Sequence, residues 1–230
     1  SPFVFDSLSS VGAQPWGCVL SPNGRYLYVG NGINGSLEIV DITVPSSPSA
    51  YVVSFGLITN YLILHPDGRY LYALGSSTAG ICTFDLSDQA HTSLLSQFSL
   101  SNLNNFICHP TGSCLYATNG VANVVRIFSL TDPKNPSLLS FTVPTGTNPN
   151  TLLISPTQQY LYVANTDSNT LSIFSLEDPL APTLQNTFAS ASLLSPGFLI
   201  THPTMLYLYV ANGVVASIAL FDISSEASPV

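Results

Sequence analysis

The chain of 230 residues contains very little charge. Charged residues make up 7% of it, against about a quarter in an average globular protein, and four cationic side chains leave a net charge of −8. A nucleic-acid surface needs clustered Lys and Arg, so nucleic-acid binding is not expected. No apolar run is long enough to predict a membrane-spanning helix. Apolar residues still make up 46% of the chain, which is enough for a large core.

Lysine is also scarce, whereas Ser, Thr and Asn are abundant. This composition favours an extracellular, cell-surface or periplasmic location over the cytosol. The chain begins at Ser1 rather than at methionine, as a matured secreted protein or a fragment would. Low charge combined with positive mean hydropathy predicts that neighbouring subunits or glycans cover part of the surface.

Five copies of one pattern run along the chain. Each copy has a turn proline followed by an apolar strand rich in tyrosine, as in SPNGRYLYVGN from Ser21 and SPTQQYLYVAN from Ser155. The five prolines lie 44, 44, 46 and 47 residues apart. A period of about 45 residues is typical of one four-stranded propeller blade. The sequence therefore predicts an all-β fold, a five-bladed β-propeller of four-stranded antiparallel blades that forms one domain over residues 1–230.

The two ends of the chain each supply part of one repeat. The predicted repeats cover residues 15–55, 59–100, 103–143, 149–190 and 196–230. The last repeat stops after its third strand, whereas residues 3–8 occupy the phase of a fourth strand before the first repeat. We therefore expect the N-terminal segment 1–12 to complete the last blade and close the ring. The alternative is an excerpt of a longer propeller cut at the same phase.

Two cysteines depart from the repeat in the same hairpin. Cys114 stands where the other repeats have tyrosine, and Cys108 stands where they have Leu, Ile or Thr. We expect the two positions to face each other across the hairpin, which predicts a Cys108–Cys114 disulfide and an oxidising compartment. The alternative is a pair of buried thiols. Cys18 and Cys82 lie in different repeats and are expected to stay unpaired.

The predicted channel has no ionisable side chain. The first strand of each blade lines the centre of a propeller, and here those strands contain no Asp, Glu, His, Lys or Arg; they are residues 15–20, 59–64, 103–108, 149–154 and 196–201. General acid–base catalysis needs a titratable group within reach of the substrate. The sequence therefore predicts a protein that is not an enzyme, with no catalytic residue and no cofactor.

Three histidines share one position of the repeat, directly before the turn proline. They are His65, His109 and His202, and serine fills the same position in the other two repeats. Exchange of Ser and His at one position favours a turn cap over a metal ligand, and imidazoles in different blades lie too far apart for bonds of about 2 Å to one ion. No metal site is expected.

Neutral amides and aromatic rings gather in the loops that enter the first strands and in those that join second to third strands. The predicted ligand-binding residues are Trp16, Asn60, Tyr61, Asn104, Asn105, Asn150 and Asp167. Rings supply contact area and amides fix orientation, as a carbohydrate or peptide ligand would require. The alternative is ordinary turn composition, because Asn is common in turns. The single glycosylation sequon begins at Asn34 and would matter only in a secretory host.

The motif YVAN at 162–165, followed by NTLSIF at 169–174, resembles the YVTN family of β-propeller repeats. The segments 28–31 and 36–41 are similar, and the resemblance extends over all five repeats. It implies the blade fold rather than an activity. Relatives of this kind include surface-layer and surface-antigen propellers and, more distantly, lactonase-like propellers with seven blades.

These observations together predict a non-catalytic extracellular or cell-surface propeller that acts as a scaffold or interaction module within an assembly. The expected partner is another protein or a second copy of the chain, and a glycan is a further candidate. Two alternatives stay open, a lactonase-like hydrolase and a glycan-binding, lectin-like propeller. Ionisable groups converging in the channel would favour the hydrolase, and repeated equivalent pockets would favour the lectin.

Overall fold

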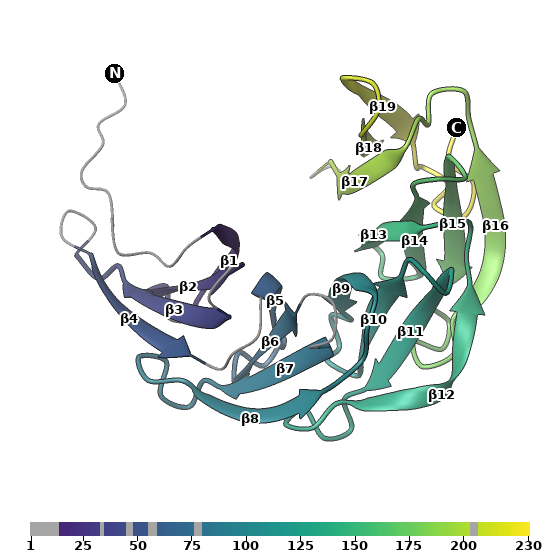
Figure 1. Cartoon of the computed structure of the whole chain (residues 1–230). Helices are drawn as coiled ribbons and strands as arrows, with labels where there is room; N and C mark the ends of the chain where they lie inside the picture. Colours follow the sequence, from purple (N-terminus) through teal and green to yellow (C-terminus); the bar gives the residue numbers. More distant parts are fainter. Residues whose placement is uncertain (1–13, 33–34, 45–47, 55–58, 76–79, 203–206) are drawn as a thin grey trace, which may run out of the picture. The chain divides into compact units, whose positions relative to one another are not determined.

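The computed structural model describes residues 14–32, 35–44, 48–54, 59–75, 80–202 and 207–230. Within these ranges the chain forms nineteen β-strands in five antiparallel sheets, and no helix occurs among them (Figure 1). The predicted all-β fold of four-stranded antiparallel sheets is confirmed. The predicted closing strand, residues 3–8, lies outside the described residues, so ring closure stays a prediction.

By its internal contacts the chain divides into two units. Unit 1 comprises residues 1–101 and 132–136, and unit 2 comprises residues 102–131 and 137–230. Unit 1 contains two sheets whose strands follow chain order. They are β1 (Pro15–Leu20), β2 (Tyr26–Asn31), β3 (Ser36–Asp41) and β4 (Ser49–Ser54), then β5 (Thr59–Leu64), β6 (Tyr70–Gly75), β7 (Gly80–Asp85) and β8 (Ser93–Phe98).

Unit 2 contains three sheets built in the same way. The first two are β9 (Leu103–Cys108), β10 (Cys114–Asn119), β11 (Val124–Ser129) and β12 (Ser137–Pro144), then β13 (Pro149–Ile154), β14 (Tyr160–Asn165), β15 (Thr170–Ser175) and β16 (Thr183–Ala189). The third has three described strands, β17 (Pro196–Thr201), β18 (Tyr207–Asn212) and β19 (Ser217–Asp222). The five first strands have the bounds that the repeat alignment predicts.

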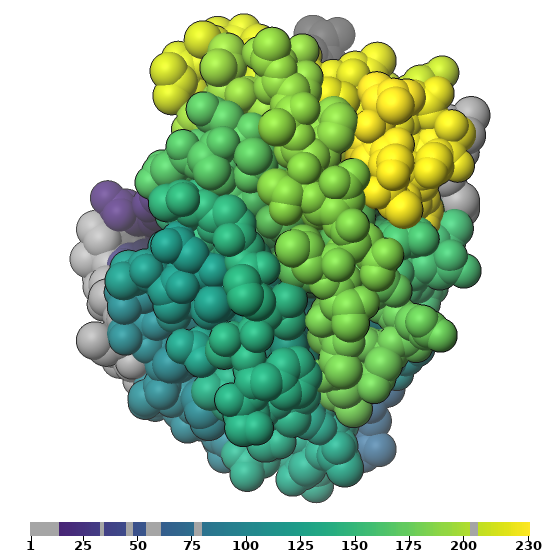
Figure 2. All heavy atoms as spheres, turned by 90° about the vertical axis from the view of Figure 1, so that its right-hand side faces the viewer, coloured from purple at the N-terminus to yellow at the C-terminus, as the bar shows by residue number. Residues whose placement is uncertain are grey.

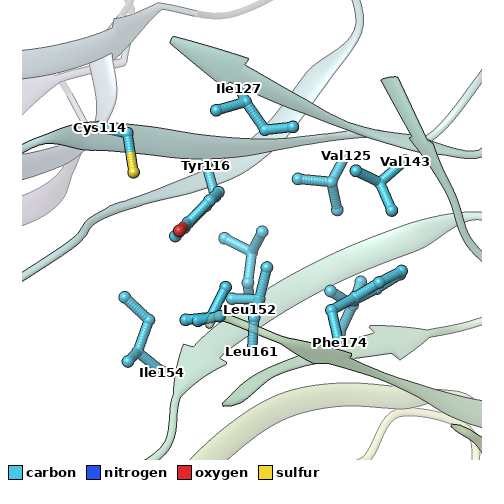
Figure 3. Close-up of a cluster of buried hydrophobic side chains, with 11 residues drawn as sticks. Cys114, Tyr116, Val125, Ile127, Val143, Leu152, Ile154, Leu161 and Phe174 are labelled. Atoms are coloured by element: carbon cyan, nitrogen blue, oxygen red, sulfur yellow. The ribbon is translucent and has the colours of Figure 1, made fainter. Parts of the chain in front are cut away.

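The middle sheet of unit 2 shows why the second strands are apolar throughout. Leu161 and Val163 of β14 pack into one core with side chains of β10 and β11, such as Val125 (Figure 3). The alternate residues Tyr162 and Ala164 pack into a second core with side chains of β17 to β19. Successive side chains of a strand point to opposite faces, so a strand between two sheets must be apolar at every position.

A buried tyrosine in four of the five second strands links its sheet to the next repeat along the chain. In four sheets the hydroxyl donates to a backbone carbonyl in the linker that follows the third strand of the next repeat. The pairs are Tyr28 with Gln89 at 3.1 Å, Tyr72 with Pro133 at 3.0 Å, Tyr116 with Pro179 at 2.7 Å and Tyr162 with Glu226 at 2.8 Å. The four tyrosines are fully buried, where a phenol hydroxyl needs such a partner.

The side chain of the residue before the turn proline accepts a hydrogen bond within the hairpin turn. This is the turn cap that the exchange of Ser and His at this position predicts. The Ser21 hydroxyl accepts a hydrogen bond of 2.9 Å from the backbone N–H of Tyr26. At the same position of a later repeat, Nδ1 of His109 accepts from the backbone N–H of Thr111 at 3.3 Å. Both side chains therefore hold a tight turn between a first and a second strand.

The predicted Cys108–Cys114 disulfide is wrong. All four cysteines are thiols in the structure. The strand register pairs Cys108 with Leu115, one residue beyond Cys114. Adjacent residues of a strand point to opposite faces, so the two sulfur atoms lie on opposite faces of the sheet. The Cys114 thiol donates to the carbonyl of Pro179 at 3.4 Å, and the Cys108 thiol donates to that of His109 at 3.4 Å.

Candidate functional site

The first strand of every sheet breaks register with the second strand at its entrance, the end where the chain enters the strand. In the first sheet, for example, Pro15 pairs with Asn31 and Gly17 pairs with Gly30, which leaves Trp16 as an extra residue. The equivalent extra residues in the other sheets are Asn60, Asn104, Asn150 with Thr151, and Gly197. Such bulges bend a strand and redirect its side chains, and they are over-represented next to active sites.

The bulges coincide with most of the predicted ligand-binding residues. Trp16, Asn60, Asn104 and Asn150 are themselves bulge residues, and Tyr61 and Asn105 follow directly after a bulge. The side chain of Asn60 lies outside the part that the structure describes, as does the predicted glycosylation residue, Asn34. The remaining residue, Asp167, lies in the turn between β14 and β15.

In unit 1 the entrance is apolar. The Trp16 ring is 68% exposed and lines a shallow cavity of about 280 Å³ together with Pro15, Cys18, Leu27 and Val29. Tyr61 is 39% exposed in the second sheet. No titratable carboxylate or cation lines this cavity, so it offers contact area rather than acid–base chemistry.

In unit 2 the entrance carries a connected polar network. Asn104 donates from Nδ2 to the carbonyl of Pro149 at 3.0 Å and reaches Oδ1 of Asn148 at 3.5 Å. Asn148 in turn donates from Nδ2 to Oδ1 of Asp167 at 3.3 Å. The structure thus joins two predicted residues, Asn104 and Asp167, through a third, Asn148. We call these three residues the entrance network.

The backbone holds Asn148 in place. Its φ is +55°, in the left-handed region where asparagine is tolerated better than most residues. Its N–H donates to Oδ1 of Asn123 at 2.8 Å, and its carbonyl accepts from the N–H of Thr166 at 3.0 Å. Gly120 packs directly against the two amides. A Cβ at this position would lie only 2.7 Å from Oδ1 of Asn148 and 2.3 Å from Nδ2 of Asn104.

Asn105 and Asn150 make hydrogen bonds within and between strands rather than to the entrance network. Oδ1 of Asn105 accepts from the backbone N–H of Phe106 at 2.7 Å, and the carbonyl of Asn150 accepts from the hydroxyl of Thr118 at 2.7 Å. The second contact joins β10 to the bulge of β13. These two predicted residues therefore support the entrance network rather than extend it.

A shallow cavity opens beside the end of the turn that carries Asp167. Its volume is about 440 Å³, and it is lined by Ser168 and Asn169, which follow Asp167, and by residues between Ala189 and Leu194. This volume lies within the range of small-molecule pockets, about 300–1,000 Å³. Asp167 is exposed, so one of its oxygens is held by Asn148 while the carboxylate stays accessible to water.

Comparison with protein families gives two matches. Residues 102–200 match the model described as "Lactonase, 7-bladed beta-propeller", and residues 18–55 match the LVIVD repeat. A comparison with curated proteins finds no match. The described residues contain no helix long and apolar enough to cross a membrane. They also contain no group of three or more His, Cys, Asp and Glu side chains that could hold a metal ion.

Solved structures of similar fold include several bacterial propellers. A periplasmic gluconolactonase of Pseudomonas aeruginosa is 19% identical, with a TM-score of 0.78 over 96% of this chain and 70% of that one. A putative 6-phosphogluconolactonase of Bacteroides fragilis is 21% identical, with a TM-score of 0.78 over 95% and 69%. A functionally unknown protein of Desulfotomaculum acetoxidans is 14% identical, with a TM-score of 0.82 over 96% and 69%.

These matches correct the functional prediction. The expected non-catalytic scaffold and the expected absence of enzyme activity are contradicted by the lactonase match and by the lactonase-like structures, which favour the alternative of a hydrolase. The prediction rested on the absence of ionisable groups from the first strands, and it counted Asp167 only as a ligand-binding residue. Asp167 comes from the turn between the second and third strands, which opens at the same end of the sheet. The chain is a β-propeller, and the segment that matches the lactonase model, residues 102–200, lies almost entirely within its second unit.

Proposed function

We propose that this protein is a lactonase-like hydrolase that opens the ring of a sugar lactone. The observation that carries the proposal is the position of the family match, because residues 102–200 contain the whole entrance network of Asn104, Asn148 and Asp167. Similar folds are described as a gluconolactonase and as putative 6-phosphogluconolactonases. The cavity lined by Ser168 and Asn169, the two residues after Asp167, has the volume of a small-molecule pocket.

The reaction requires a base and a stabilised oxyanion. Water adds to the carbonyl carbon of the lactone, the ring C–O bond breaks, and the ring oxygen leaves as a hydroxyl to give a hydroxy acid. The Asp167 carboxylate would accept the proton of the attacking water and return it to the ring oxygen. Asn148 would orient that carboxylate through the bond of 3.3 Å.

The amides would hold the substrate. Asn148 has a second hydrogen on Nδ2 besides the one given to Asp167, and this hydrogen is available to the developing oxyanion. Asn104 donates its two amide hydrogens to the carbonyl of Pro149 and to Oδ1 of Asn148. It would thereby fix the orientation of Asn148, which donates to the oxyanion. In this arrangement Asn104 is a positioning residue, and Asp167 is the catalytic residue.

The test is the hydrolysis of glucono-1,5-lactone, followed by the acid that it releases. We expect the wild-type chain to exceed the uncatalysed rate and Asp167→Asn to lower kcat by about 100-fold or more, the usual contribution of a general base. Asp178→Asn is the matched control. Asp178 accepts from the N–H of Leu180 at 2.9 Å in the linker after β15, at the opposite end of that sheet, and we expect its loss to change kcat by less than about twofold.

Two outcomes would contradict the proposal. A wild-type chain that does not accelerate lactone opening would refute hydrolase activity. A fully active Asp167→Asn variant would remove Asp167 from the mechanism.

A further inference from the structure

We infer that the substrate is an unphosphorylated, neutral sugar lactone rather than a sugar lactone phosphate. The inference rests on the proposed function, since it names the substrate class of the same site. It addresses a choice that the comparisons leave open, because the similar structures include both a gluconolactonase and putative 6-phosphogluconolactonases.

A phosphate group carries close to two negative charges and is normally bound by Lys, Arg or unpaired backbone N–H groups. The whole sequence contains four cationic side chains, and the structure describes all of them. They are Arg25, Arg69, Arg126 and Lys134. The location of each can therefore be compared with the entrances of the sheets.

Three of the four cations lie at the end of their own sheet that is opposite to its entrance. Arg25 and Arg69 are in hairpin turns between first and second strands, where each backbone N–H donates to an Asx side chain two residues before it. Lys134 is in the linker between β11 and β12. In an antiparallel sheet these two kinds of connection share one end, and strands of six residues separate the ends by about 20 Å.

The fourth cation, Arg126, points away from the entrance network. It lies in the middle of β11, and β10 separates it from β9, the strand that carries Asn104. Its neighbour Val125 packs into the core shared with the sheet of β13 to β16, on the side where Asn104 contacts Pro149. Because successive side chains alternate, Arg126 lies on the other face of its sheet.

Backbone N–H groups at the entrance do not replace the missing cations. Among the described residues, those of Gly146, Thr147 and Asn148 donate to side-chain oxygens of Ser172, Ser168 and Asn123, at 3.3, 3.0 and 2.8 Å. The N–H of Ser195, across the cavity, donates to Oδ1 of Asn169 at 2.6 Å. Because these four donors are occupied, they cannot form the cluster of unpaired N–H groups that anion-binding loops use.

The charge and the polar groups that remain favour a neutral ligand. Asp167 places a negative charge in the entrance network, and this charge would repel a phosphate. The amide of Asn148 can instead donate to the hydroxyl groups of a sugar, and the carboxylate of Asp167 can accept from them. The site therefore selects for uncharged rings bearing hydroxyls.

The test compares kcat/KM of the wild-type chain for glucono-1,5-lactone and for 6-phosphoglucono-1,5-lactone at equal ionic strength. We expect the neutral lactone to be preferred by at least about tenfold, which corresponds to 1.4 kcal/mol. Equal or greater kcat/KM for the phosphorylated lactone would overturn the inference while leaving the hydrolase intact. Hydrolysis of neither compound would overturn both.

A charge-addition pair sharpens the test. Thr147→Lys places a cation next to Asn148 at an exposed position, whereas Thr183→Lys places the same cation at the exposed start of β16, at the opposite end of that sheet. We expect Thr147→Lys to raise the phosphorylated-to-neutral kcat/KM ratio at least about threefold, an effect that salt weakens, and Thr183→Lys to leave it unchanged. An equal change in both variants would show that net charge, not the entrance, controls selectivity.

Discussion

The hydroxyl of Tyr162 donates a hydrogen bond of 2.8 Å to the backbone carbonyl of Glu226, 64 residues further along the chain. The side chain of Glu226 adds a second tie, since its carboxylate accepts from the hydroxyl of Ser155 at 2.8 Å. These bonds hold the C-terminal segment against the sheet of β13 to β16, and Figure 2 shows the yellow C-terminal residues packed against green residues of unit 2. Burial raises the pKa of Tyr162, so its hydroxyl stays a donor at any ordinary pH.

Removing this hydroxyl should destabilise the fold measurably. We expect Tyr162→Phe to lower the free energy of unfolding by about 1–2 kcal/mol, because it leaves the carbonyl of Glu226 without its buried donor. Tyr160→Phe is the matched control in the same strand, since among the described residues no hydrogen bond from its hydroxyl is present. Denaturant unfolding measures both, and equal losses in the two variants would contradict the role of the bond.

A methyl group beneath the entrance network should impair activity without unfolding the protein. Gly120→Ala places a Cβ 2.3 Å from Nδ2 of Asn104 and 2.7 Å from Oδ1 of Asn148, so both amides must shift. Both are ends of flexible side chains, and Gly120 has no positive φ, so we expect the Tm to change little. Lactone hydrolysis should fall at least about tenfold. Wild-type kinetics in this variant would exclude the network from the site.

His109 should make stability depend on pH. Burial lowers the pKa of His109, so the unfolded chain, with a histidine pKa of about 6.5, takes up the proton first as pH falls. Stability is therefore unaffected above about pH 7 and decreases as the pH falls towards about 5. In His109→Ser, the cap used by Ser21 replaces the imidazole, and we expect a smaller decrease over that interval. Parallel curves for the two proteins would refute this origin of the pH dependence.

Thiol reactivity should distinguish the exposed Cys18 from the buried Cys82 and Cys114. Cys18 is exposed, whereas Cys82 and Cys114 are buried, and burial raises the pKa of Cys82 to about 11. Since the thiolate is the reactive form, we expect Cys18 to react first with a disulfide reagent and the two buried thiols to react only after unfolding. Cys18→Ser should remove the fast phase. Detection of fewer than four thiols in unreduced, unfolded protein would contradict the thiol state seen in the structure.

The repeat allowed much of the fold to be predicted. The predicted bounds of the first strands match β1, β5, β9, β13 and β17, because the turn proline and the strand that follows it recur in every copy. Trp16 and Asn104 both lie at bulges of first strands, since aligned positions of a repeat have the same place in each sheet, whereas their predicted role in ligand binding stays a prediction. Asn148 was not included among the chosen ligand residues, although its place directly before a first strand was a usable signal.

The repeat pattern is sufficient to predict the sheet order, the bounds of the first strands and the end of each sheet at which polar loops gather. The direction in which an individual side chain points follows only from the folded structure. A shift of one residue places Cys108 opposite Leu115 and removes the disulfide, and a bulge turns Asn104 towards Asn148, 44 residues away. Composition and period are properties of a segment, whereas side-chain direction and partner depend on register and on the packing of separate repeats against each other.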